Sequence, residues 1–182
     1  MLTTNRRCFW MIAGLGLAVI SSSRGEPEPL RHEAIVDAPV DQVWGAFTTK
    51  AGLESWMAAK VEIELRVGGK MRTRYAADGT LGDAQTIENM ILSFEPERMI
   101  SIRVTKCPEG FPYTKVIQSM WSVVRFEDLG ANRTRFTVTS MGFGDDEESK
   151  KMREHFDKGN AWTVEKLRAK FARGDGEQKT AD

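Results

Sequence analysis

The sequence is poor in cysteine and histidine, and it has no excess charge of either sign. Its 182 residues include two cysteines, Cys8 and Cys107, and two histidines, His32 and His155. These are too few for a Cys/His zinc site or a disulfide framework. Basic and acidic side chains number 26 each, so no basic field would attract a phosphate backbone. We therefore expect no metal, no other cofactor and no nucleic-acid partner.

Long apolar runs are also scarce, and the one present lies at the N-terminus. Arg6 and Arg7 precede the uncharged residues 9–20, and three serines follow at 21–23. A basic start, an apolar run shorter than the roughly 20 residues of a membrane span, and a small-residue end are typical of a signal peptide. Residues 5–9 (NRRCF) resemble a twin-arginine export signal. We expect residues 1–23 to direct export to the periplasm and to make the only membrane contact. A short membrane anchor or a buried helix is the alternative.

The rest of the chain divides into a linker, one domain and a tail. Residues 24–30 contain two prolines and predict an extended linker. Residues 31–173 suffice for one domain with its own core. Residues 174–182 follow a predicted helix end at Gly174 and predict a disordered tail. Without residues 1–23 the chain keeps a single cysteine, so its stability cannot depend on an intramolecular disulfide.

Hydrophobic periodicity predicts a domain rich in antiparallel strands. Val61, Ile63 and Leu65 alternate with charged residues, as in a strand with one buried face. The same reasoning predicts strands at 31–36, 71–75, 85–94, 99–105, 116–127 and 134–141. Apolar residues at helical spacing predict two short helices, at 40–47 and 50–57, and one long helix at 145–171.

The order of these elements indicates the α+β class. Because parallel strand–helix–strand alternation is absent, we expect one antiparallel sheet with the long helix on its concave face. Acids at 145–148 open the long helix and basic residues close it, which matches the helix macrodipole. These acids lack the ligand spacing of a calcium-binding loop.

Six segments carry a family resemblance. They are residues 38–47 (APVDQVWGAF), 53–57 (LESWM), 67–70 (VGGK), 94–100 (FEPERMI), 121–127 (WSVVRFE) and 159–167 (GNAWTVEKL). In order and spacing they resemble the START-like superfamily called SRPBCC, and within it the branch similar to the activators of the heat-shock-protein ATPase. The resemblance implies a helix-grip fold, as in Bet v-like proteins: a curved antiparallel sheet wraps around the C-terminal helix and leaves an apolar cavity. Members bind lipids, polyketides and other hydrophobic molecules, and some are cyclases or hydrolases.

Large apolar side chains on the elements that bound such a cavity are the candidates for its wall. They are Trp56, Tyr75, Met90, Ile102, Met120, Trp121, Phe136, Phe156 and Trp162. Ordinary core packing is the alternative for each of them. A buried aromatic side chain usually only fills space, and methionine suits a core as well as a cavity.

Residues that would mark an enzyme are sparse. His155 could act as a general base and Cys107 as a nucleophile, alone or as a pair. Gly-x-Ser-x-Gly, Walker-type and His-Glu-x-x-His motifs are absent. We therefore expect a binding protein whose partner is a small hydrophobic molecule. A cyclase- or hydrolase-like enzyme using the same cavity and a co-chaperone-like interaction module are the alternatives, and the sequence makes no prediction of the oligomeric state.

Overall fold

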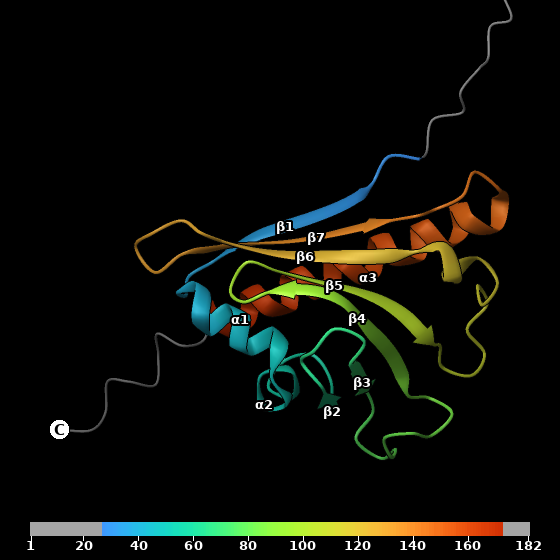
Figure 1. The fold of residues 1–182 in the computed structure, drawn as a ribbon, viewed down its shortest axis with the longest axis horizontal. Helices are drawn as coiled ribbons and strands as arrows, with labels where there is room; N and C mark the ends of the chain where they lie inside the picture. Colours follow the sequence, from blue (N-terminus) through green and yellow to red (C-terminus); the bar gives the residue numbers. More distant parts are fainter. Residues whose placement is uncertain (1–26, 173–182) are drawn as a thin grey trace, which may run out of the picture.

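The computed structural model describes residues 27–172, which form one seven-stranded antiparallel sheet, three α-helices and one 3₁₀ helix (Figure 1). The strands are β1 (Leu30–Val36), β2 (Lys60–Ile63), β3 (Lys70–Arg74), β4 (Ile87–Glu95), β5 (Met99–Lys106), β6 (Trp121–Asp128) and β7 (Thr134–Met141). The helices are α1 (Val40–Thr48), α2 (Lys50–Glu54), η1 (Val116–Ser119) and α3 (Glu147–Ala172). The predicted signal peptide, the start of the predicted linker and the predicted tail lie outside the described residues.

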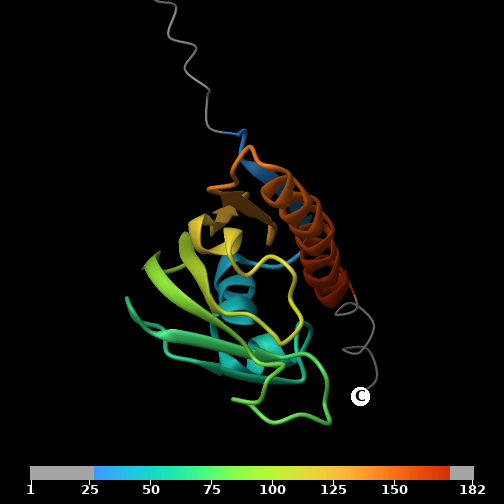
Figure 2. The same ribbon diagram turned by 90° about the vertical axis from the view of Figure 1, so that its right-hand side faces the viewer.

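The sheet is built mainly from strands that are neighbours in the sequence. Its order is β1-β7-β6-β5-β4-β3-β2, so only β1 joins a strand distant in the chain. Its pairing with β7 sets His32 opposite Val138. The sheet curves, and α3 lies against its concave face (Figure 2). The expected α+β, helix-grip arrangement is therefore confirmed.

Several predicted strands have other bounds in the structure, and two of them show why. The strand predicted through Leu65 stops at Ile63, because the chain turns back at Gly68, whose φ of 74° lies in the left-handed region that favours glycine. The strand predicted from residue 116 begins at Trp121. Residues 116–119 instead form η1, and the apolar character of Ile117 reflects its burial against other side chains.

Side chains satisfy free backbone N–H groups at the start of α2 and of α3, whereas α1 follows Pro39 without a side-chain cap. The Thr49 hydroxyl accepts from Gly52 N–H at 3.0 Å and starts α2, which ends at Glu54, short of the predicted residue 57. At the start of α3, the Asp146 carboxylate accepts from the Ser149 hydroxyl at 2.6 Å and from its N–H at 2.9 Å. These hydrogen bonds hold the pKa of Asp146 below its usual range. Acids near 145–148 thus serve the helix terminus.

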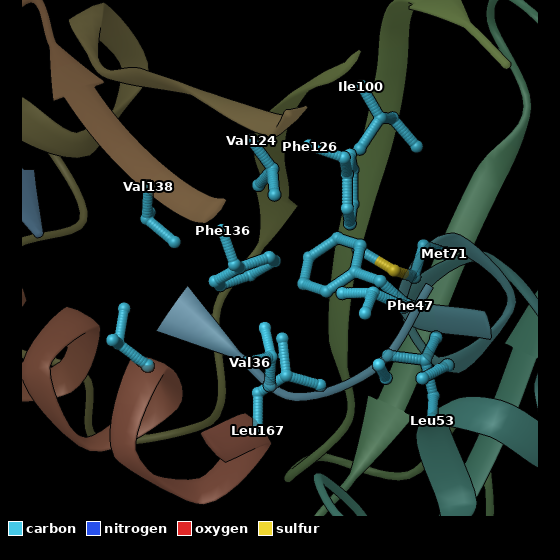
Figure 3. Close-up of a cluster of buried hydrophobic side chains, with 14 of the residues drawn as sticks. Val36, Phe47, Leu53, Met71, Ile100, Val124, Phe126, Phe136, Val138 and Leu167 are labelled. Atoms are coloured by element: carbon cyan, nitrogen blue, oxygen red, sulfur yellow. The ribbon is translucent and has the colours of Figure 1, made fainter. Parts of the chain in front are cut away.

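The interior contains two groups of buried side chains. The larger, which we call the main core, centres on Phe47, Phe126 and Phe136, whose ring centroids lie 5.5 to 6.0 Å apart (Figure 3). The smaller, which we call the second core, comprises Leu30, Ile117, Met120, Phe143 and Met152. The long helix contributes Val164 and Leu167 to the main core and Met152 to the second. The two cores are therefore joined by the middle of α3.

Candidate ligand-binding site

A cavity of about 570 Å³ lies between the two cores. Its wall includes Phe47 and Val124 of the main core and Ile117 and Met120 of the second core. The concave face of the sheet, the middle of α3 and the segment from 107 to 120 supply the wall. Its size falls within the roughly 300–1,000 Å³ of typical small-molecule sites.

The helix leaves part of this space open where it presents small side chains. Gly159, Asn160 and Thr163 line the cavity, and their spacing sets them on one helix face, while the larger His155, Phe156 and Trp162 of the same helix also line it. A Cβ atom added at Gly159 would meet nothing within 4 Å. Larger residues at these positions would fill the space.

Five of the nine residues proposed from the sequence line the cavity. They are Tyr75, Ile102, Met120, Phe156 and Trp162. The Tyr75 and Trp162 rings lie 6.1 Å apart in an edge contact, and these residues are 48% and 41% exposed. The pair therefore stands at the rim of the cavity, where the residue after β3 meets α3.

Two of the other four proposed residues belong to the packing of the main core. Phe136 is fully buried between Phe47 and Phe126. Trp56 packs against that core, its ring 6.3 Å from Phe47, and its Nε1–H donates to Ala46 O at 2.9 Å. For these two, the alternative of ordinary core packing describes the structure.

For the last two, Met90 and Trp121, the alternation of side chains along a strand argues against a place in the cavity wall. Asn89 and Ser122 line the cavity, and successive strand residues point to opposite faces of a sheet. Met90 directly follows Asn89, and Trp121 directly precedes Ser122, so both side chains point to the opposite, convex face of the sheet. Met90 is 38% exposed. Their place in the expected wall is corrected on this ground.

The polar part of the wall was not predicted from the sequence. Asn89, Ser122 and Asn160 line the cavity, as does Gly159, and none of them was proposed. For Asn160 a signal was present, because a polar residue at 160 interrupts the apolar face of the long helix. For Ser122, alternation with Val124 was the signal.

The cavity wall contains few ionisable groups. Tyr75, Cys107 and His155 line it, and Asp, Glu, Lys and Arg do not occur among the lining residues. Burial raises the pKa of the Cys107 thiol, so the thiol stays protonated at neutral pH and is a poor nucleophile. The His155 ring lies 5.5 Å from that of Phe111 in an edge contact. Cys107 is thus half-buried against apolar side chains, whereas His155 is exposed beside aromatic rings.

These features define a helix-grip protein with a cavity between the sheet and the long helix. The chain belongs to the family of the Activator of Hsp90 ATPase homolog 1-like protein, whose model matches residues 37–172. The match confirms the SRPBCC/START-like resemblance and its activator-like branch. No curated protein matches the sequence.

Solved structures with the same fold come from varied proteins. The Aha1 dimer from Colwellia psychrerythraea is 15% identical with a TM-score of 0.63, and the match covers 82% of this chain and 99% of that one. CalU16 from Micromonospora echinospora is 24% identical with a TM-score of 0.56, covering 82% and 77%. The di-domain ARO/CYC protein BexL of the BE-7585A biosynthetic pathway is 15% identical with a TM-score of 0.63, covering 82% and 48%. At these identities the likeness establishes the fold.

Proposed function

We propose that this protein is exported and binds a small hydrophobic molecule in the cavity between the sheet and α3. The observation that carries the proposal is a cavity of about 570 Å³ with a mainly apolar wall and without Asp, Glu, Lys or Arg in its lining. Apolar burial supplies the affinity for such a ligand, and a few polar groups orient it.

Export is the second part of the proposal, and residues 1–23 support it through their basic start and short apolar run. Within residues 27–172, no helix is both long and apolar enough to cross a membrane. Exchange of Arg6 and Arg7 for lysine in the full chain tests the twin-arginine route. We expect the variant to stay in the cytoplasm on cell fractionation, and a periplasmic variant would contradict that route.

A cyclase-like enzyme is the second candidate, since the ARO/CYC protein BexL has a similar fold. Such chemistry needs acids or bases aimed at the substrate, and the cavity wall offers only Tyr75, Cys107 and His155. A co-chaperone role would require contact with a cytosolic ATPase, from which an exported protein is separated. Binding is therefore the function that the site supports best.

The first experiment is native mass spectrometry, with organic extraction, of the mature protein purified from the periplasm of the cells that produce it. We expect a stoichiometric hydrophobic adduct. A clean apo mass, together with no uptake from a lipid and metabolite extract, would contradict the binding function.

A variant that fills the cavity locates the adduct. Gly159→Leu places a side chain in open space on a helix, so it should leave the protein folded. We expect it to weaken binding of an apolar dye such as N-phenylnaphthylamine by roughly tenfold or more, since each 1.4 kcal/mol of lost contact is tenfold in affinity. Gly45→Leu is the matched control: Gly45 is also helical and open at its Cβ position, but it does not line the cavity. Equal losses in both variants would contradict the location.

A further inference from the structure

Three polar side chains form a hydrogen-bonded row at the helix side of the cavity. Asn160 Nδ2 on α3 donates to Ser140 Oγ on β7 at 3.0 Å. Ser140 Oγ lies 2.8 Å from Ser122 Oγ on β6, and the two serines are directly paired in the sheet. Asn160 is 8% exposed and Ser140 is fully buried. The row therefore crosses from the helix to two neighbouring strands inside the protein.

Only one arrangement of the hydrogens in this row lets the Ser140 hydroxyl both accept and donate a hydrogen bond. A hydroxyl has one hydrogen to donate and two lone pairs to accept with. Ser140 accepts from Asn160, so its own hydrogen goes to Ser122 Oγ, the only other partner it has among residues 27–172. The Ser122 hydrogen then has no acceptor within those residues. Asn160 likewise has an acceptor, Oδ1, and a second amide hydrogen that make no hydrogen bond within residues 27–172.

The two residues that keep unused groups belong to the cavity wall. Ser122 and Asn160 line the cavity, whereas Ser140 lies behind them and holds them in place. Buried polar groups are nearly always hydrogen-bonded. A donor on Ser122 beside a donor and an acceptor on Asn160 thus forms a preset site for a polar atom of a ligand.

The charge of the ligand follows from the wall. Asp, Glu, Lys and Arg are absent from the lining, and burial of an unpaired charge is far more costly than burial of a hydrogen-bonded neutral group. No Asp, Glu, Lys or Arg of the lining supplies a counter-charge for a carboxylate or an amine, and His155 is the single basic side chain among the lining residues.

We propose that Ser122 and Asn160 bind the hydroxyl or carbonyl oxygen of a neutral, otherwise apolar ligand, an inference that rests on the proposed function. The ligand oxygen accepts from the Ser122 hydroxyl, and a ligand hydroxyl also donates to Asn160 Oδ1. The same pair of side chains selects against hydrocarbons without an oxygen and against fatty-acid anions.

Competition against a cavity-bound apolar dye tests the inference with decanol, decane and decanoate, which share one chain length. We expect decanol to bind roughly three- to tenfold more tightly than decane, as one or two neutral hydrogen bonds allow. Decanoate should bind most weakly at neutral pH. Tighter binding of decanoate than of decanol would overturn the assignment of a neutral ligand.

Variants at the row assign the preference to the named side chains. Ser122→Ala should bind decane as the unaltered protein does and lose the preference for decanol, and Ser122→Thr, which keeps the hydroxyl, should retain it. Ser101→Ala is the matched control, because Ser101 is a buried serine on β5 next to the cavity-lining Ile102 but outside the lining itself. Urea unfolding of each variant establishes that it is folded.

The outcomes separate this inference from the proposed function. If decane and decanol bind the unaltered protein equally, or if Ser122→Ala keeps the preference for decanol, the proposal that Ser122 and Asn160 bind the ligand oxygen is wrong. The proposed binding of a hydrophobic molecule is then unaffected. If the dye does not bind and neither decane nor decanol binds, the proposed function is wrong, and the assignment of Ser122 and Asn160 fails with it.

Discussion

The main core and the cavity are built from the same sheet and the same helix, yet one is filled and the other is open. At the main core, α3 contributes Val164 and Leu167 to the cluster that contains the aromatic rings of Phe47, Phe126 and Phe136. At the cavity, α3 contributes the small residues Gly159, Asn160 and Thr163 as well as His155, Phe156 and Trp162. Both regions are mainly apolar, so hydrophobicity alone does not distinguish them. Side-chain volume on one helix face does.

The largest expected effect breaks the filled region. Phe136→Ala removes a fully buried ring from the centre of the main core (Figure 3), and we expect a loss of about 3–5 kcal/mol in the free energy of unfolding. Phe156→Ala, at the cavity wall, should cost clearly less because its ring is only partly buried. Equilibrium urea unfolding measures both. Equal losses would contradict the difference between the two regions.

Enlargement of a side chain should also act differently at the two places. Val164→Phe adds atoms to a site that is 4% exposed within the main core, and overpacking there should cost about 1–3 kcal/mol. Gly159→Leu adds the same number of non-hydrogen atoms on the same helix but into open space, so it should not destabilise the protein. The comparison of urea midpoints is the measurement. A tolerated Val164→Phe would mean that the main core also has free volume.

A smaller effect sharpens the description of the helix beside the cavity. Gly159→Ala should stabilise the protein by about 0.5–1 kcal/mol, because alanine favours a helix over glycine and its Cβ meets no other atom there. Gly45→Ala in α1, which is open in the same way, should stabilise by a similar amount. Thermal unfolding checks both. Destabilisation by Gly159→Ala alone would show that the cavity closes against position 159.

The smallest effect concerns pH at the cavity end of the sheet. The Asp83 carboxylate accepts from Arg74 Nε at 3.0 Å, and this contact, with backbone N–H donors, lowers the pKa of Asp83 to about 2. Because the folded-state pKa lies below the usual value of about 3.9, the stabilisation is fully present above that value and is lost as the pH falls toward the folded pKa. The contact closes the loop between Tyr75 and Ile87, which both line the cavity.

Exchange of Asp83 for asparagine tests this pH dependence. We expect the unaltered chain to have the higher urea midpoint at neutral pH, and the difference from Asp83→Asn to shrink as the pH falls through the window between about 4 and the folded pKa. Arg135 pairs with Glu127 in the same way on β6 and β7 but away from the cavity, so Glu127→Gln controls for a general loss of charge. A difference that grows with acidity would contradict the sign.

The elements of the fold were predictable where the pattern is local. The strand predicted at 134–141 has those bounds, and the one predicted at 99–105 runs one residue further. The 3₁₀ helix at 116–119 was not predictable in this way, because the apolar side chain of Ile117 packs in the second core and does not belong to β6. A short apolar run reports burial and does not distinguish strand from helix.

The site was predictable only in part. Met120, Phe156 and Trp162 were proposed and line the cavity, whereas Trp121 was proposed beside Met120 although β6 starts with it on the other face. Choice by side-chain size favoured aromatic residues. It overlooked Gly159, whose lack of a side chain helps to leave the space.

The sequence by itself determined the order of strands and helices, the α+β class and the family, because periods of two and of 3.6 residues and the family motifs are local properties of the chain. Only the tertiary structure decided where the cavity lies. A cavity is a difference between the volume that the backbone encloses and the volume that side chains from distant elements fill. Residues such as Asn89, Ser122 and Asn160, on β4, β6 and α3, acquire a common role only when the sheet curves around the helix.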